Sequence, residues 1–134
     1  MKKMTKVLAG IATIALMVVL VSFMQEKPAW DVPAKYKEMK NPSAGNADAI
    51  ALGKTTYAKF CKSCHGNLGK GDGPRAKMIK TPIDDFTSAE FKKHPAGVVY
   101  YMSIVGRGDM PNFEKKITDE ETRWAVVSYI ESLK

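Results

Sequence analysis

One short segment constrains this chain more than any other feature. Both of its cysteines and one of its two histidines occur in Cys61-Lys62-Ser63-Cys64-His65. This pattern is typical of covalent haem attachment. Cysteines three positions apart in a helical turn share one face, so both sulfurs can bond to the vinyl groups of a single porphyrin. The next residue, His65, can then give a ring nitrogen to the iron. Because the pattern occurs once, we expect one covalent haem c.

Three other interpretations of the motif are open at this point. A thioredoxin-like dithiol would follow a strand in a βαβ unit, whereas the residues before Cys61 have helical spacing. A zinc site would need a fourth ligand, from His94 or from a carboxylate. A disulfide between Cys61 and Cys64 would close a very small loop and would leave His65 without a role. Haem attachment is favoured because it gives all three residues a function.

The N-terminal segment predicts export. Three lysines precede an uncharged apolar run from Val7 to Met24. Residues 1–24 are therefore a signal peptide or an N-terminal membrane anchor, and the weak cleavage signals after the run favour the anchor. A buried helix is disfavoured, because the run is apolar all round rather than striped. Lysines before the run place that end in the cytoplasm, so we expect the domain on the periplasmic side of the cytoplasmic membrane, anchored through residues 7–24 or released.

The charge balance indicates what kind of partner the chain binds. Its 21 Lys and Arg residues exceed its 14 Asp and Glu residues, which gives a formal net charge of +7. No basic tract interleaved with aromatic residues stands out, so nucleic acid is not an expected partner. Redox partner proteins with acidic docking surfaces are the simpler expectation.

The residues before the motif predict a linker and then a helix. Residues 25–45 contain three prolines among charged residues, which favours an extended linker. Trp30 and Tyr36 either pin this linker to the domain or merely cover an apolar patch. From Asn46, a suitable N-cap, apolar residues recur at helical spacing. Gly53 inside this helix costs about 1 kcal/mol relative to alanine, and a close approach of another helix would explain it.

Two further helices are predicted in the C-terminal half. Residues 97–105 are apolar and form a short helix. Residues 118–121 read as a capping box with acidic residues in the first turn. The helix that follows is amphipathic, with one stripe formed by Trp124, Val127, Ile130 and Leu133.

Two loops are the candidates for the two faces of the haem. Residues 66–74 hold four glycines and a proline, and a carbonyl near Pro74 is expected to accept the second N–H of His65. Residues 106–113 hold Met110 between glycines and a proline, which is unusual for a methionine that only packs in a core. Met110 is therefore the expected distal ligand. Met78 and Met102 are the alternatives, although Met102 lies in the apolar helix and is more simply a core residue.

Taken together, these segments resemble a class I c-type cytochrome over roughly residues 46–134. The resemblance implies an all-α cytochrome c fold, a small helical domain wrapped around one covalently bound haem. It is carried by Gly53 and Tyr57, by CKSCH at 61–65, GKGDGP at 69–74, TPIDDFTSAEF at 81–91, GRGDMPNF at 106–113 and WAVVSYI at 124–130.

The resemblance also assigns roles to single residues. It implies that His65 and Met110 are the axial ligands of the iron and that the carbonyl of Pro74 accepts the His65 N–H. It suggests Arg107 as a partner of the haem propionates. It further implies that the first and last helices cross, with Gly53 and Tyr57 against Val126 and Tyr129.

The expected function is therefore that of an electron carrier rather than of an enzyme. It would move single electrons between respiratory-type redox partners outside the cytoplasmic membrane. One alternative is a haem c subunit of a larger membrane oxidoreductase complex. Another is a gas-binding haem sensor, which would require Met110 to be absent from the iron. Exposed lysines could ring the haem edge and steer docking, namely Lys62, Lys70, Lys77 and Lys80.

Overall fold

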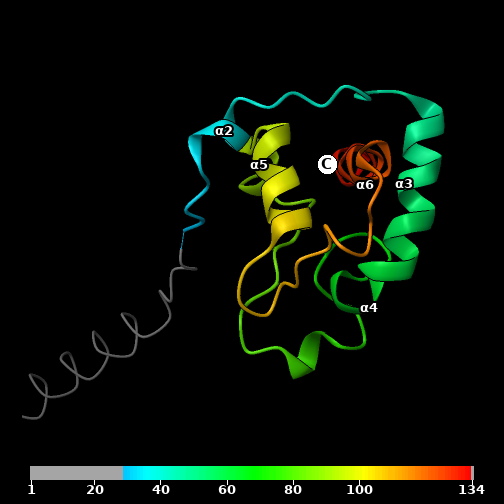
Figure 1. The fold of residues 1–134 in the computed structure, drawn as a ribbon. Helices are drawn as coiled ribbons and strands as arrows, with labels where there is room; N and C mark the ends of the chain where they lie inside the picture. Colours follow the sequence, from blue (N-terminus) through cyan, green and yellow to red (C-terminus); the bar gives the residue numbers. More distant parts are fainter. Residues whose placement is uncertain (1–28, 134) are drawn as a thin grey trace, which may run out of the picture.

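The computed structural model describes residues 29–133, and these residues form a single helical unit (Figure 1). The expected signal peptide or anchor at residues 1–24 lies outside the described residues. Within residues 29–133 all regular elements are helical, apart from one isolated antiparallel bridge between Arg107 and Met110. This confirms the all-α prediction. In the same part of the chain, no helix combines the length and the apolar character that crossing a membrane requires.

Two long helices, α3 (Ala47–Phe60) and α6 (Glu120–Ser132), make the central contact of the fold. Figure 1 shows α6 end-on and α3 from the side, so the two helices cross. A Cβ on Gly53 would overlap the carbonyl oxygen of Ala125 and would lie 2.9 Å from the Cβ of Tyr129. The Tyr57 and Tyr129 rings are 5.1 Å apart. The predicted helix crossing is therefore present, with Ala125 rather than Val126 directly facing Gly53.

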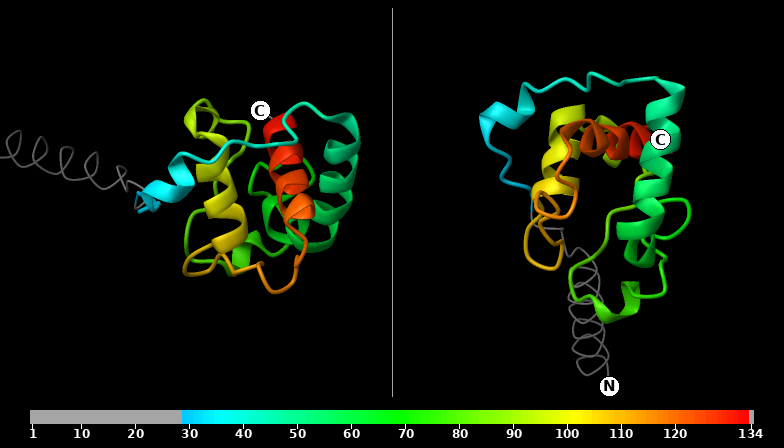
Figure 2. Two further views of the ribbon diagram at one scale, coloured as in Figure 1. Left: turned by 45° about the horizontal axis from the view of Figure 1, so that its top comes forward. Right: turned by 45° about the vertical axis from the view of Figure 1, so that its right-hand side comes forward.

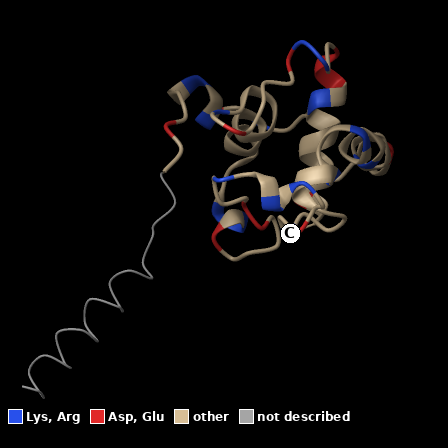
Figure 3. Ribbon diagram, turned by 90° about the horizontal axis from the view of Figure 1, so that it is seen from below, with Lys and Arg blue, Asp and Glu red and all other residues tan. Residues whose placement is uncertain are grey.

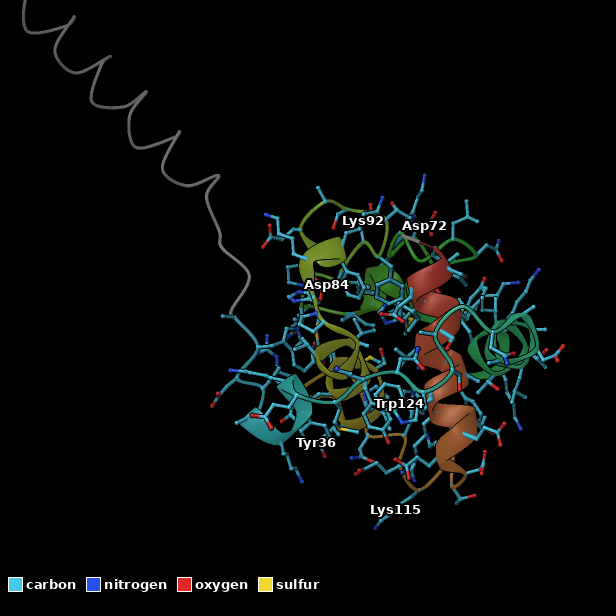
Figure 4. All side chains as sticks on the ribbon, turned by 90° about the horizontal axis from the view of Figure 1, so that it is seen from above. Tyr36, Asp72, Asp84, Lys92, Lys115 and Trp124 are labelled. Carbon is cyan, nitrogen blue, oxygen red and sulfur yellow. The ribbon has the colours of Figure 1, made fainter. Side chains whose placement is uncertain are left out.

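The middle of helix α6 is buried on all sides rather than along one stripe. Every residue from Trp124 to Ile130 is buried. The reason is that α6 lies between α3 and α5 (Ala96–Tyr100), as Figures 1 and 2 show. Figure 4 shows Trp124 between α5 and α6, and its ring lies 4.5 Å from that of Tyr100. On another side, the hydroxyl of Ser128 accepts a hydrogen bond from the Asn41 amide at 2.9 Å.

The helix ends follow local capping rules. The Asn46 side chain accepts hydrogen bonds from the amides of Asp48 and Ala49 at 2.9 and 3.0 Å, which confirms it as the N-cap of α3. At the start of α6 the cap is Asp119, whose carboxylate accepts from the Thr122 amide at 2.7 Å. The helix therefore begins one residue later than the predicted capping box implies.

The predicted apolar helix over residues 97–105 is present, but it changes from an α-helix to a π-helix halfway along. It begins as α5 and continues as a π-helical turn, η3 (Tyr101–Val105), which ends at Gly106. The remaining elements are short and lie in the connections between the long helices. They are α2 (Ala34–Lys37), α4 (Lys62–His65), η1 (Ala76–Met78) and η2 (Phe91–Lys93).

The segment predicted as a linker packs against the domain from residue 29 onward. Val32 is only 4% exposed and belongs to the core. The Tyr36 ring lies 4.8 Å from the Tyr101 ring. A side chain on Gly97 would overlap the backbone of Tyr36, so this glycine lets α2 approach α5 closely. The packed unit thus begins before residue 46, and Figure 2 shows the segment running across α5 and on to α3.

Candidate haem-binding site

The two cysteines lie on a single turn that directly continues α3. The Cys61 amide donates to the Tyr57 carbonyl at 2.9 Å, which completes α3. The Cys61 carbonyl then accepts from the amides of Cys64 and His65 at 3.1 and 3.0 Å, which forms α4. Both cysteines are free thiols. The helical turn predicted from the spacing is therefore present, and no disulfide closes it.

The loop after the motif fastens the motif's own backbone. Four consecutive carbonyls, those of residues 63–66, each accept one hydrogen bond from outside the turn. The donors and distances are Arg75 N to Ser63 O at 2.9 Å, Gly73 N to Cys64 O at 3.1 Å, Gly71 N to His65 O at 3.0 Å and Tyr57 Oη to Gly66 O at 2.8 Å. A Cβ on Gly73 would lie only 2.5 Å from the Ser63 carbonyl oxygen, so glycine is needed for this close approach. The turn is consequently held by two segments, the loop at residues 71–75 and Tyr57 of α3.

His65 has the properties of a metal ligand. Its Nδ1 atom is buried and has no hydrogen-bond partner among the described residues. Its ring stacks on Phe86, with centroids 4.7 Å apart and planes 22° apart. Burial lowers the pKa of His65 from 6.5 to about 4, and this outweighs the opposite effect of the Asp84 carboxylate. The imidazole is therefore neutral near pH 7, which is the form that binds metals.

The two thiols differ in their surroundings. Cys61 is 7% exposed, whereas Cys64 is half-buried. Burial raises the pKa of the Cys61 thiol to about 12, and the neighbouring Cys64 adds to the effect. Cys61 thus remains a protonated thiol at neutral pH until it is bonded. Within residues 29–133 no three His, Cys, Asp or Glu side chains are grouped as a metal-ion cage requires, so the zinc interpretation has no ligand set.

The second candidate loop, residues 106–113, presents Met110. The Met110 amide donates to the Arg107 carbonyl at 2.9 Å, which closes a tight turn. On the outer side of the turn, the Asp109 carboxylate accepts from the Thr81 hydroxyl at 2.7 Å and from the Thr81 amide at 3.3 Å. Met110 itself is partly buried against the core cluster. The loop is therefore ordered by specific hydrogen bonds as well as by packing of Met110 against the core.

The comparison with known proteins agrees with this geometry. The model of the family described as Cytochrome c matches residues 50–134. The chain belongs to the cytochrome c family. No curated protein matches it.

This cytochrome carries one covalently bound haem c, and its residues fit that group. The two free thiols on one turn suit attachment to one porphyrin edge. His65 is half-buried and neutral, and its buried Nδ1 has no hydrogen-bond partner among the described residues, so the imidazole is not committed to another group. The family also establishes the coarse function, that of a c-type cytochrome that carries electrons.

The other predicted site residues have different surroundings in the cytochrome. Met102 is 5% exposed inside η3, as expected of a core residue, and Met78 is 78% exposed. Neither is held in a loop as Met110 is. Met110 as the distal ligand remains a prediction.

Pro74 and Arg107 were also predicted to touch the haem. Pro74 lies between Gly73 and Arg75, whose amides both bind the motif, but it accepts no hydrogen bond from His65. The Arg107 guanidinium points to the N-terminal segment, where it donates to the Ala29 carbonyl at 2.6 Å. Both roles in binding the haem remain predictions.

Sequence reasoning missed several contacts that shape the site. The hydrogen bond from Tyr57 to Gly66, the stacking of Phe86 on His65 and the pair Thr81–Asp109 all join separate segments. No spacing rule marks such pairs, because they depend on how the chain folds back on itself.

Proposed function

We propose that this cytochrome carries single electrons between protein partners outside the cytoplasmic membrane, with His65 and Met110 as the axial ligands of its iron. The observation that supports this most directly is the neutral, half-buried His65, with a buried Nδ1 that has no partner among the described residues, immediately after two free thiols. The ordered Met110 loop is the second support. When bound, the haem supplies one-electron redox chemistry.

The protein's own residues would hold this centre rather than react. Cys61 and Cys64 would anchor the group covalently. Phe86 would fix the plane of the His65 ring by stacking on it. The Met110 thioether, a soft ligand, would favour ferrous iron and raise the reduction potential. With both axial positions filled, no substrate would bind the iron, so no acid–base or nucleophilic residue is required.

Basic residues around the motif would guide docking. Lys62, Lys70, Lys77 and Lys80 are all exposed and come from the segment that encloses the motif. Figure 3 shows Lys and Arg spread over several segments on the lower side of the molecule rather than gathered in one tract. Such a distribution suits transient docking to an acidic protein surface. In this proposal the domain works on the periplasmic side, either tethered by residues 7–24 or released.

The test is carbon monoxide binding by the reduced protein, purified after expression with a working haem-ligation system. The wild-type protein should be red, low-spin and unreactive to carbon monoxide without denaturant. Met110→Ala should open the iron, bind carbon monoxide and have a lower reduction potential. Met102→Ala is the control; as a core substitution it should lower stability, but it should keep the low-spin spectrum and stay unreactive to carbon monoxide.

Each other outcome has a clear meaning. A colourless wild-type protein would refute haem binding altogether. Wild-type reactivity to carbon monoxide would indicate a gas-binding sensor instead of a carrier. If Met102→Ala opens the iron and Met110→Ala does not, the ligand assignment is wrong. Copurification with a larger membrane complex at high salt would indicate a permanent subunit rather than a mobile carrier.

A further inference from the structure

The loop that carries Met110 is fastened on two sides by different parts of the chain. One tie is the pair Asp109–Thr81, described above. The other tie is Arg107. Its guanidinium donates to the carbonyl of Ala29 at 2.6 Å and lies 4.0 Å from the centroid of the Trp30 ring. A cation at this distance over an indole ring is attracted to it. The second tie therefore joins the loop to residues 78 positions earlier in the chain.

Trp30 is itself held in place, so it can serve as an anchor. Its ring packs edge-on against Tyr101, at 6.4 Å between centroids. Tyr101 opens η3, the π-helical turn that leads directly into the Met110 loop. Tyr36 contacts the same ring at 4.8 Å, and the buried Val32 secures the backbone between Trp30 and Tyr36. Residues 29–39, the N-terminal strap, thus form a packed support beside the loop.

A displacement of Arg107 is transmitted to Met110 through the backbone. The Arg107 carbonyl accepts the Met110 amide at 2.9 Å, and the two residues form the only β-bridge within residues 29–133. At Gly106, where φ is +69°, a side chain would overlap the Met110 carbonyl. The turn is therefore too tight for its two ends to move separately. Whatever holds Arg107 also positions Met110.

We propose that Arg107 and Trp30 are positioning residues for Met110, and that the N-terminal strap determines how firmly the sulfur stays on the iron. This inference rests on the proposed role of Met110 as the distal ligand. The strap also connects the apolar run at residues 7–24 to the domain. A force or partner acting on that connection would consequently alter the ligation of the iron.

The expected effect on imidazole binding follows from an equilibrium between two states, with Met110 either bound to the iron or released from it. An external ligand such as imidazole binds ferric iron only when Met110 has left it, so its apparent affinity rises in proportion to the open fraction. Loss of the cation–π contact and of one charged hydrogen bond should raise the open fraction about tenfold.

The experiment is an imidazole titration of the full-length ferric holoprotein at fixed neutral pH, followed by loss of the weak red absorption band that methionine ligation gives. Arg107→Gln should bind imidazole about tenfold more tightly than wild type, and Trp30→Leu about threefold, because it removes only the cation–π contact and leaves the hydrogen bond to Ala29. Trp30→Leu keeps apolar bulk against Tyr101, so the packing is largely retained. Arg107→Lys keeps a cation over the ring and should recover part of the wild-type behaviour.

The control is Lys59→Gln on α3. It also removes one positive charge, that of an ammonium group 5.0 Å from the centroid of the Phe60 ring. It should leave imidazole binding unchanged. The double variant Trp30→Leu/Arg107→Gln should bind imidazole no more tightly than Arg107→Gln alone, because Arg107→Gln already removes the contact with the Trp30 ring. Additive effects would instead mean that Arg107 acts elsewhere, for example on a propionate, and would overturn the proposal.

A second readout does not depend on the iron. The Met110 amide should exchange its hydrogen about tenfold faster in Arg107→Gln than in wild type, as expected of a loop that opens more often. Arg107→Gln and Trp30→Leu could bind imidazole as Lys59→Gln does, and the Met110 amide could exchange equally fast in Arg107→Gln and Lys59→Gln. Those results together would show that the N-terminal strap does not position the loop. If wild type lacks the red band, the assignment of Met110 fails first, and that result is distinct from failure of the strap.

Discussion

At the scale of single residues, Tyr57 links the core to the haem-binding turn. Its ring packs on Tyr129, and its hydroxyl donates to the buried carbonyl of Gly66 at 2.8 Å. Burial, assisted by the neighbouring Cys61, raises the pKa of Tyr57 above its usual range, so it remains a neutral donor. One side chain thereby fixes the residue that ends α4 directly after His65.

Tyr57→Phe should lower the free energy of unfolding by about 1–3 kcal/mol, because the Gly66 carbonyl would stay buried without a partner. Denaturant unfolding of the holoprotein measures this. The control is Tyr36→Phe, since the Tyr36 hydroxyl has no hydrogen-bond partner within the part of the chain that the structure describes. Equal stability losses in both variants would show that this hydrogen bond contributes little.

Single residues also show what sequence reasoning can and cannot reach. Cys61, Cys64 and His65 were recognisable because their chemistry depends on spacing along one turn. Arg107 and Trp30 were both noticed, but not as partners of each other. Trp30 lies far from Arg107 in sequence, and only the folded path of the chain brings a ring under that guanidinium.

At the scale of elements, the crossing of α3 and α6 depends on the absence of one side chain. Gly53 lets the backbone of α6 approach at Ala125. Alanine at this position would improve helix propensity by about 1 kcal/mol. It would also place a methyl group against a backbone carbonyl, which cannot rotate away as a side chain can. The steric cost should therefore exceed the gain in propensity.

Gly53→Ala should accordingly destabilise the protein by about 1–3 kcal/mol, the usual cost of overpacking. Thermal and denaturant unfolding are the measurements. Thr55→Ala, at an exposed position of the same helix, is the control and should leave stability unchanged or slightly increased. A Gly53→Ala variant as stable as Thr55→Ala would mean that the helices can separate at no cost.

The helices themselves were largely predictable, and the exceptions have physical causes. Asn46 and the apolar spacing marked α3 correctly. For α6 the predicted stripe was too narrow, because the segment around Asn41 covers a face that a lone helix would expose. That segment was interpreted as a linker because its prolines and charges outnumber its apolar residues. In the structure Val32 is buried in the core, and Trp30 and Tyr36 pack against it. The π-helical winding of η3 leaves no pattern in the sequence.

At the scale of the whole molecule, charge should govern how fast the protein finds its partners. Lys70→Glu and Lys77→Glu each reverse one charge on the proposed docking side. Each should slow electron transfer to an acidic redox protein about tenfold at low salt. Stopped-flow kinetics over a range of ionic strengths measures this. Screening should reduce the difference as the salt concentration rises.

The matched control is Lys54→Glu, an exposed residue of α3 outside the segment that encloses the motif. It changes the net charge equally and should alter the rate much less. Equal effects of all three substitutions would show that total charge matters rather than a defined docking surface.

The contact between α3 and α6 joins segments that lie far apart along the chain. Until α6 has docked, α3 has no helix to pack against and the surface around Gly53 is open to water. A chain that has not yet folded therefore leaves the CKSCH motif accessible. Any enzyme that must reach both sulfurs has this interval in which to act, before the finished core closes over Cys61.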